Sequence, residues 1–357
     1  MAILRYGFIA IASAVLLYAL MVLGSSLVFA AMELGESLDT GSTRTDMFFG
    51  VSGLTADVYD RTPLIRDQPQ IILMGASNVQ KFRADIVAAH LDGFAAHNMS
   101  IGGLPLHDWT RMADLTYEVV PRDAWSKLTF VVGVWYGTFS EGATSHSWQL
   151  DDEMARYGLY RRTAHGDYAL RIPNSLVPAA SIALRPVIVD ARAWDTFRES
   201  NGKIVDALLL GRPVAQTIDV FEQDIAVLSD SKRRALLIQL RQKENGSISD
   251  RAFAELRALA QHVSRAGSRI VVVDLPIPQW HANAVPAFAD YQRRKQPHFA
   301  ALRKMKNVYY IDLQQGFSDS DFYDTVHARP KAAGMLSERL AAGLAPIVDS
   351  MPAGPGR

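Results

Sequence analysis

The chain has 357 residues, of which 49% are hydrophobic and 21% are charged, so it is long enough for one large domain or two small ones. Its 37 Lys and Arg residues balance its 37 Asp and Glu residues, which leaves no basic excess for a phosphate backbone, and we expect no nucleic-acid partner. The absence of cysteine excludes disulfides, thiolate zinc sites and cysteine nucleophiles, and it permits an oxidising compartment without requiring one.

The N-terminal segment contains a long uncharged run. Residues 6–32 carry no charged side chain, and such a run is long enough to cross the hydrocarbon core of a membrane with some tilt. We predict a retained transmembrane anchor that follows a cytoplasmic tail, residues 1–5, in which Arg5 and the amino terminus are positive. A cleaved signal peptide is the alternative, because SSLVFAAM contains small residues that suit a peptidase. Both interpretations export the rest of the chain, so we expect a periplasmic globular domain. With the retained anchor, the chain is a single-pass protein of the inner membrane.

The segment after the anchor predicts a stalk and then an α/β domain. Residues 33–69 are rich in acidic residues, Gly, Ser and Thr, which is typical of a juxtamembrane stalk. From residue 70 onward, apolar runs typical of strands alternate with helical patterns. The predicted strands are 71–74, 95–99, 128–135, 269–275 and 308–313, and the predicted helices are 82–90, 107–119, 249–265, 287–304 and 330–344. This alternation indicates a doubly wound parallel sheet over residues 70–345, followed by a C-terminal tail, residues 346–357.

The alternation lapses between residues 140 and 248. This segment is rich in arginine and has one clear helical pattern, at 219–243, so we predict a mostly helical insertion at the carboxyl edge of the sheet. It would serve either as a lid or acceptor-binding element or as a structural elaboration with a solvated charged face.

The first strand leads directly to a candidate nucleophile. Ile71 to Met74 run into Gly75-Ala76-Ser77-Asn78, after which a helical pattern begins. Ser77 is therefore predicted at the carboxyl edge of the sheet, where ligands bind in open α/β sheets, with its hydroxyl near the free N–H groups of a helix. The alternative is that Ser77 only caps that helix.

A candidate base and acid lie beyond the last predicted strand. Asp324 and His327 are three residues apart, just before Pro330 opens the last helix, and this loop should lie at the same sheet edge as Ser77. A serine hydroxyl needs a base to take its proton, and the base needs an acidic partner to fix its tautomer. The joint placement of the three residues predicts a Ser77–His327–Asp324 triad.

At these residues the sequence resembles the SGNH (GDSL-like) hydrolase superfamily. The matching segments are GASN with Ser77, HNMSIGG with Gly102 or Gly103, and D-x-x-H with Asp324 and His327, and the resemblance covers Gln70 to about Leu344 apart from the insertion. It implies a flavodoxin-like three-layer fold in which Ser77 attacks an ester and the N–H of Gly102 or Gly103 stabilises the oxyanion.

One motif departs from the family pattern. The family's G-x-N block, whose Asn donates to the oxyanion, has Trp135 in place of Asn. The oxyanion hole would then use backbone N–H groups of Ser77 and Gly102 or Gly103, with Asn78 or Tyr136 as a further donor. Losing one donor can cost about 10²–10³ in rate. Because it combines this departure with an N-terminal anchor, the chain resembles the exported branch of the family, which modifies cell-envelope polymers. That branch includes the alginate O-acetylation proteins and the D-alanyl transfer protein of lipoteichoic acid, which work beside membrane-bound acyltransferases.

Other residues carry weaker signals. His281 follows a predicted strand and would either line the same site or lie in a surface loop, and the remaining histidines lack partners at metal-ligand spacing. We therefore predict no metal or cofactor. Trp135, Tyr136 and Trp109 would form either a sugar-stacking wall or buried aromatic packing.

We expect from the sequence an exported serine O-acetyltransferase or acetylesterase that acts on a cell-envelope glycan or exopolysaccharide, with a membrane-bound acyltransferase as a possible partner. The alternative is a non-catalytic scaffold that keeps the fold and binds glycan or that acyltransferase. Transfer and hydrolysis differ only in whether a sugar hydroxyl or water attacks the acyl-enzyme, and no residue of the sequence decides between them.

Overall fold

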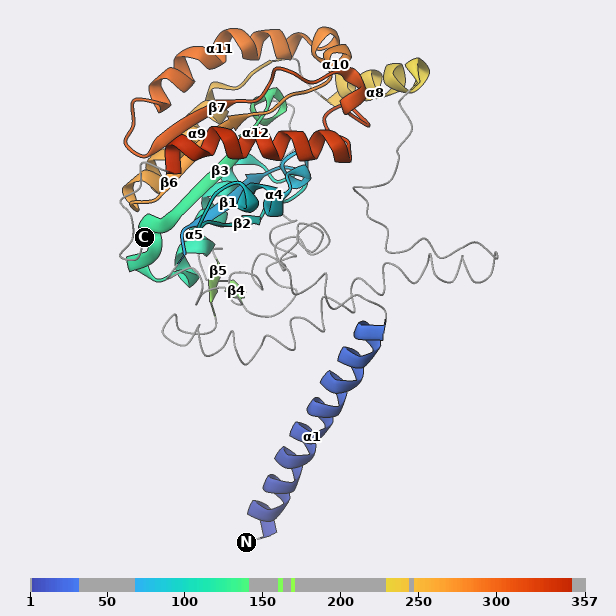
Figure 1. The fold of residues 1–357 in the computed structure, drawn as a ribbon, viewed down its shortest axis with the longest axis vertical. Coiled ribbons are helices and arrows are strands. Elements are labelled where there is room, and N and C mark those ends of the chain that lie inside the picture. Colours follow the sequence, from blue (N-terminus) through green and yellow to red (C-terminus); the bar gives the residue numbers. More distant parts are fainter. Residues whose placement is uncertain are drawn as a thin grey trace.

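The structure is a computed structural model that describes residues 2–31, 68–140, 160–162, 168–170, 229–243 and 247–348 (Figure 1). The predicted stalk up to residue 67, most of the insertion and the end of the C-terminal tail lie outside the described residues.

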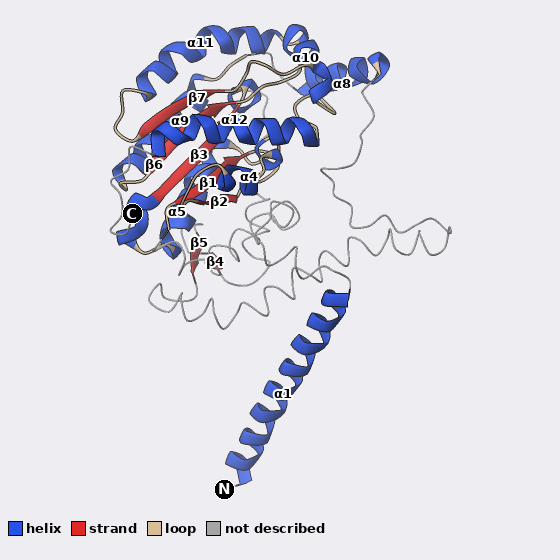
Figure 2. Ribbon diagram, in the orientation of Figure 1, coloured by secondary structure: helices blue, strands red, loops and turns tan. Residues whose placement is uncertain are grey.

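A five-stranded parallel sheet forms the centre of the domain (Figure 2). Its strands follow the order β2-β1-β3-β6-β7, and every neighbouring pair is parallel. The strands are β1 (Gln70–Gly75), β2 (Ala95–Asn98), β3 (Leu128–Val134), β6 (Arg269–Asp274) and β7 (Val308–Asp312). This arrangement confirms the predicted α/β class. The strand order reverses at β1, where the chain crosses from β2 to β3, and such switch points are where open α/β sheets bind ligands.

Helices cover both faces of the sheet. Helices α4 (Ala84–Ala89) and α12 (Pro330–Val348) share one buried apolar cluster with Ile71 and Leu73 of β1. Helices α5 (Leu106–Val119), α9 (Asp250–Arg265) and α11 (Pro286–Leu302) share the other with Ile72 and Met74. Successive side chains of a strand point to opposite faces, so the uninterrupted apolar run of β1 supplies both clusters.

The predicted helix 82–90 corresponds to α4, which begins at Ala84, and a further turn that was not predicted precedes it. The chain forms a 3-10 turn, η1 (Val79–Lys81), before α4 begins. The buried side-chain amide of Asn98 donates to the carbonyls of Val79 (2.9 Å) and Phe82 (3.0 Å). Asn98 is the last residue of β2, so its side chain ties the turn that carries Ser77 to the neighbouring strand.

The N-terminal helix α1 runs from Ala2 to Ala31. Large apolar side chains between Tyr6 and Leu20 are exposed on it. Among the described residues, no helix is both long and apolar enough to span a membrane. The anchor stays a prediction.

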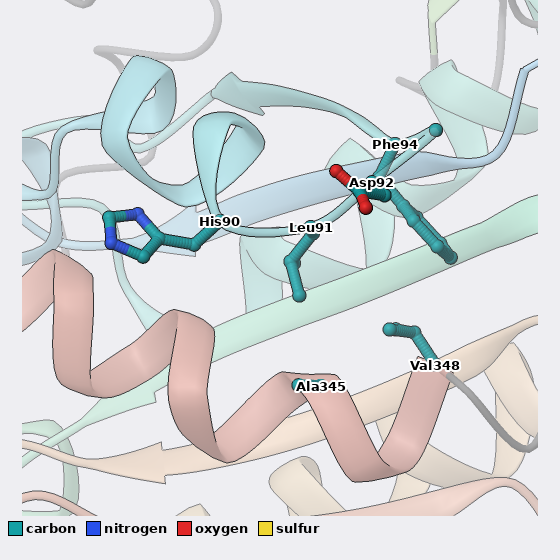
Figure 3. Close-up of a pocket in the computed structure, with 7 residues that line it drawn as sticks. His90, Leu91, Asp92, Phe94, Ala345 and Val348 are labelled. Atoms are coloured by element: carbon teal, nitrogen blue, oxygen red, sulfur yellow. The ribbon is translucent and has the colours of Figure 1, made fainter.

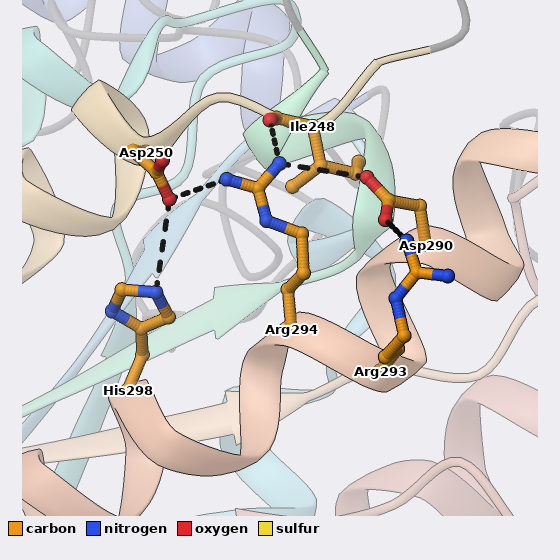
Figure 4. A network of polar contacts seen from close by, with 6 residues as sticks. All are labelled: Ile248, Asp250, Asp290, Arg293, Arg294 and His298. Atoms are coloured by element: carbon orange, nitrogen blue, oxygen red, sulfur yellow. Dashed lines mark hydrogen bonds and ion pairs between the residues drawn. The ribbon is translucent and has the colours of Figure 1, made fainter.

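The insertion leaves and rejoins the domain at one place. Ser140 and Ile248 form an antiparallel bridge, and the N–H of Ser249 donates to the carbonyl of Phe139 (2.8 Å). Arg294 of α11 donates to the carbonyl of Ile248 and to the carboxylate of Asp250 (Figure 4). Helix α11 therefore fixes the point of re-entry.

Within the insertion, the described elements are few. Strands β4 (Tyr160–Arg162) and β5 (Tyr168–Leu170) form a short antiparallel pair that the sequence did not predict. Helix α8 (Asp230–Lys243) matches the second part of the predicted helix 219–243, whose first residues lie outside the described ranges.

Candidate active site

Two glycines at the ends of adjacent strands allow the turn that contains Ser77 to pack closely against the sheet. Gly75 and Gly133 are paired in register at the carboxyl ends of β1 and β3. A Cβ on Gly75 would lie 2.3 Å from Cγ2 of Val79, and one on Gly133 would lie 2.4 Å from the same atom. Gly75 also has a φ of 155°, which L side chains rarely adopt. The Val79 side chain therefore packs directly over both glycines, and the turn containing Ser77 is seated on the strand ends.

The second half of the site is a narrow hairpin, residues 322–328, which we call the triad hairpin. Phe322 and Ala328 form an isolated antiparallel bridge at its base, and the N–H of Tyr323 donates to the carbonyl of His327 (3.1 Å). At its tip, Oδ1 of Asp324 accepts the backbone N–H groups of Val326 (2.9 Å) and His327 (2.8 Å). One carboxylate oxygen thus organises the tip and leaves the other free for the imidazole.

The structure brings Ser77, His327 and Asp324 into direct contact. Nδ1 of His327 lies 2.6 Å from Oδ2 of Asp324, and Nε2 lies 2.8 Å from Oγ of Ser77. The carboxylate can only accept, so Nδ1 carries the proton and the lone pair of Nε2 faces the serine hydroxyl. This is the arrangement in which an imidazole removes the proton of a serine nucleophile.

The charge state of Asp324 suits this arrangement. Burial alone would raise its pKa, but the hydrogen bond and charge of His327 and the two backbone N–H donors outweigh burial and lower the pKa below its ordinary value. Asp324 is therefore ionised at neutral pH and stabilises a positive imidazole.

Free backbone donors lie beside Ser77. A Cβ on Gly102 would lie 3.6 Å from Cβ of Ser77, so Gly102 borders the serine. Gly103 has a φ of 72° in a turn closed by the N–H of Leu104 and the carbonyl of Ile101, as a type II turn requires. Within the described part of the chain, the N–H groups of Ser77 and Gly102 donate to no acceptor.

The other predicted site residues are more enclosed. Asn78 is 8% exposed, and neither atom of its amide has a hydrogen-bond partner among the described residues. The hydroxyl of Tyr136, in η3 (Tyr136–Phe139), lies 2.6 Å from Nε2 of His281. Trp135 is half-buried, packs edge-on against Tyr136 and contacts both apolar clusters. Trp109 is buried in the core, which favours the packing interpretation for that residue.

Near the triad, the sequence left the place of His281 open and gave no sign of Tyr323 or Lys81. The surface interpretation of His281 is wrong, because its side chain is 0% exposed; it lies on α10 (Gln279–Ala284), which was not predicted. The ring of Tyr323 stacks on His327 with centroids 5.5 Å apart, and Nζ of Lys81 lies 5.3 Å from the centroid of Tyr323. Burial lowers the pKa of Lys81, against the opposing charge of Asp324. No local pattern in the sequence signals these contacts, since each joins separate segments.

A buried charged cluster lies at the carboxyl end of β6. Asp274, at the end of β6, accepts hydrogen bonds from Tyr291 (2.8 Å), Lys295 (2.7 Å), Gln314 (3.1 Å) and Tyr310 (3.2 Å). Burial raises the pKa of Asp274 to about 6, although Lys295 and Tyr291 act in the opposite direction. The cluster joins β6, β7 and α11 and is satisfied internally.

A cavity of about 560 Å³ lies away from the triad (Figure 3). It is lined by the turn between α4 and β2, from His90 to Phe94, and by Ala345 and Val348 at the end of α12. This turn precedes β2, so the cavity lies at the amino edge of the sheet, opposite Ser77. Among the described residues, no group of three or more metal-ligating side chains is arranged to hold a metal ion.

Comparison with known proteins identifies no family. No family model matches the chain, and no curated protein matches it. The structure by itself supports a coarser statement: a five-stranded, all-parallel sheet flanked by helices, compatible with an α/β hydrolase-like fold.

Proposed function

We propose that this protein is a serine acyl-transfer enzyme of the SGNH type, an O-acetyltransferase or acetylesterase. The observation that carries the proposal is the continuous hydrogen-bonded chain from Asp324 through His327 to Ser77, with contacts of 2.6 and 2.8 Å at the carboxyl edge of the sheet.

The proposed reaction has two halves. Oγ of Ser77 attacks the ester carbonyl while Nε2 of His327 takes its proton, and Asp324 stabilises the resulting imidazolium. The free N–H groups of Ser77 and Gly102 stabilise the oxyanion of the tetrahedral intermediate. The intermediate collapses as His327 returns the proton to the leaving alcohol. A sugar hydroxyl or water, deprotonated by His327, then attacks the acyl-enzyme. The bond between the acyl carbon and Oγ of Ser77 breaks as His327 returns that proton to Oγ.

A cell-envelope glycan is the proposed acceptor. The uncharged N-terminal run supports an exported, membrane-anchored enzyme whose periplasmic domain meets polymers outside the cytoplasm. The acyl group is proposed to be acetyl, moved to or from the glycan, with a membrane-bound acyltransferase as a candidate donor of the acyl group.

The test uses the full-length chain in detergent with p-nitrophenyl acetate and a fluorophosphonate probe. We expect the wild type to release nitrophenolate and to carry one probe per chain, at Ser77. Ser77→Ala should abolish labelling and lower turnover to the solution background, while circular dichroism shows an intact fold. Equal turnover by both proteins would overturn the proposal.

The alternative, a non-catalytic scaffold, has one supporting observation: Trp135 stands where the family pattern has the oxyanion asparagine. That alternative predicts no labelling of the wild type, together with glycan binding that survives Ser77→Ala. Equilibrium binding of acetylated and deacetylated polysaccharide to both proteins distinguishes the two functions.

A further inference from the structure

We propose that His281 and Tyr136 form a second, buried hydrogen-bonded chain that positions the triad hairpin; the inference rests on the proposed acyl-transfer function. Nδ1 of His281 lies 2.7 Å from the carbonyl oxygen of Thr325, and Nε2 lies 2.6 Å from the hydroxyl of Tyr136. Thr325 lies between Asp324 and His327 in the chain, so this bond reaches the tip of the hairpin.

The chemistry of the partners fixes the tautomer of His281. A backbone carbonyl can only accept, so Nδ1 must carry the proton and donate to Thr325. Nε2 then accepts the hydrogen bond that the Tyr136 hydroxyl donates. Burial lowers the pKa of His281, against the Thr325 bond and the charge of Asp324, so the neutral ring that this chain needs is the favoured form. Each nitrogen has one partner, and no proton is missing or in excess.

Apart from the bonds of Thr325 to His281 and of His327 to Ser77, the hydrogen bonds at the tip given by the described residues stay within the hairpin. Asp324 accepts from Val326 and His327, which shapes the tip as a unit, and Ala328 at the base packs in the apolar cluster of α4 and α12. The bond from His281 attaches that unit to α10, which follows β6, and Tyr136 extends the attachment to η3, which follows β3. Because the imidazole of His327 must meet a hydroxyl 2.8 Å away, a small shift of the hairpin breaks the proton path.

Neither residue is placed to contact substrate. Both side chains are 0% exposed, and both nitrogens of His281 are engaged. Aromatic rings surround the pair. The ring centroids of Trp135 and Trp280 lie 6.4 and 5.9 Å from that of His281, and the ring centroid of Phe288 lies 6.0 Å from that of Tyr136. The two side chains are therefore positioning residues, and Tyr136 is not the additional oxyanion donor that the sequence allowed.

Two substitutions of His281 separate its two hydrogen bonds. In His281→Asn the amide nitrogen lies near the position of Nδ1 and can still donate to Thr325. In His281→Gln the amide reaches the position of Nε2, so it keeps a partner for Tyr136 and loses the donor to Thr325. Tyr136→Phe removes only the hydroxyl. His90→Asn is the matched control, because Nδ1 of His90 makes the same kind of bond, to the carbonyl of Ile86 (2.8 Å), on the exposed surface of α4.

Each variant is measured as the full-length chain by two methods. The rate constant of fluorophosphonate labelling and kcat/KM for p-nitrophenyl acetate report on the triad, and hydrogen exchange of residues 322–329 reports on the hairpin without requiring activity. We expect His281→Gln to lower labelling and kcat/KM by about 10²-fold and to accelerate exchange in the hairpin. His281→Asn should restore both towards wild type, Tyr136→Phe should have an intermediate effect, and His90→Asn should change neither.

The outcomes separate this inference from the proposed function. Labelling of the wild type with no difference between His281→Gln and wild type overturns the inference alone. Equal losses in His281→Gln and His281→Asn also overturn it, because the effect then does not follow the Thr325 bond. A wild type that resists the probe, with exchange that still follows the Thr325 bond, overturns the proposed function and leaves the attachment of the hairpin supported.

Discussion

Asp324 performs two tasks with its two carboxylate oxygens. Oδ1 accepts two backbone N–H groups of its own hairpin, and Oδ2 holds the proton of His327. The same residue therefore shapes the loop and selects the tautomer of the base. A substitution that keeps the first task and removes the second isolates its part in the chemistry.

Asp324→Asn is that substitution. The amide oxygen can still accept the backbone N–H groups, while the amide NH₂ faces Nδ1 of His327 and forces the proton onto Nε2, where it blocks the path from Ser77. We expect kcat for p-nitrophenyl acetate to fall by about 10⁴-fold with little change in thermal stability. Initial rates and the unfolding midpoint measure the two effects. A loss below about tenfold would show that the imidazole does not act in the tautomer that the triad requires.

The buried His281 predicts a pH dependence of stability. The pKa of His281 is lowered in the folded protein from the ordinary value of 6.5. Below pH 6.5 the unfolded chain therefore binds a proton at His281 more readily than the folded chain does. Its contribution to the free energy of unfolding is therefore complete above pH 6.5 and is lost as the pH falls through the lowered folded value. Urea denaturation of wild type and His281→Asn between pH 7.5 and 5 measures this difference. The gap between the two proteins should narrow on acidification, and a constant gap would contradict the prediction.

At the scale of elements, the turn that carries Ser77 is held by contacts with three strands. Val79 packs over Gly75 of β1 and Gly133 of β3, and Asn98, which ends β2, binds the carbonyls of Val79 and Phe82. The position of Ser77 therefore depends on the close approach of side chains to the backbone of the two glycines.

Gly133→Ala tests this packing. Its Cβ would lie 2.4 Å from Cγ2 of Val79 and 3.0 Å from Cδ1 of Leu275, so the turn must lift. We expect a loss of about 1–3 kcal/mol in the free energy of unfolding, together with slower fluorophosphonate labelling of Ser77. Adding Val79→Ala to the Gly133→Ala protein should recover part of the labelling rate, although Val79→Ala alone is destabilising. Additive losses in the double variant would contradict direct contact between the two residues.

At the scale of the whole molecule, the two ends of the insertion meet at one neck. The bridge between Ser140 and Ile248 and the bond from Ser249 to Phe139 bring both ends together, and Arg294 holds the returning strand segment. A connection whose ends already pair can be shortened without stretching the domain.

We therefore expect the domain to fold when residues 141–247 are replaced by an Asn-Gly turn. The variant loses the contact of Arg233 with Trp280 and the packing of Leu237, so its thermal midpoint should fall, but unfolding should stay cooperative. Hydrolysis of p-nitrophenyl acetate should persist, while activity on an acetylated polysaccharide should be lost if the insertion binds the acceptor. Retained activity on the polymer would favour a structural role for the insertion. A variant that does not fold would contradict the claim that the insertion can be shortened at this neck.

The sequence predicted what depends on local pattern. Apolar runs located the five strands, and their alternation with helices predicted the parallel sheet. Both signals are local, because buried strands and amphipathic helices show as patterns of apolar residues in consecutive positions. Ser77 was located by the end of the first strand, and Asp324 by its spacing from His327 in the loop between the last strand and Pro330. The roles of Asn98 and His281 could not be predicted, since each depends on which carbonyl lies within reach after folding. The 3-10 turn between Ser77 and α4 was not predicted for the same reason, since its carbonyl groups bind a side chain from another strand.

Ser77 and His327 are separated by 250 residues, and the hairpin that carries the base follows the last strand of the sheet. During synthesis the hydroxyl emerges early and has no partner for its proton until nearly the entire polypeptide has been made. In the proposed enzyme, a nascent chain that still lacks the triad hairpin consequently holds an inert alcohol in place of a nucleophile. Assembly of the proton path thus waits for the segment that follows the last strand of the sheet, and the proposed reactivity arises only when synthesis is nearly complete.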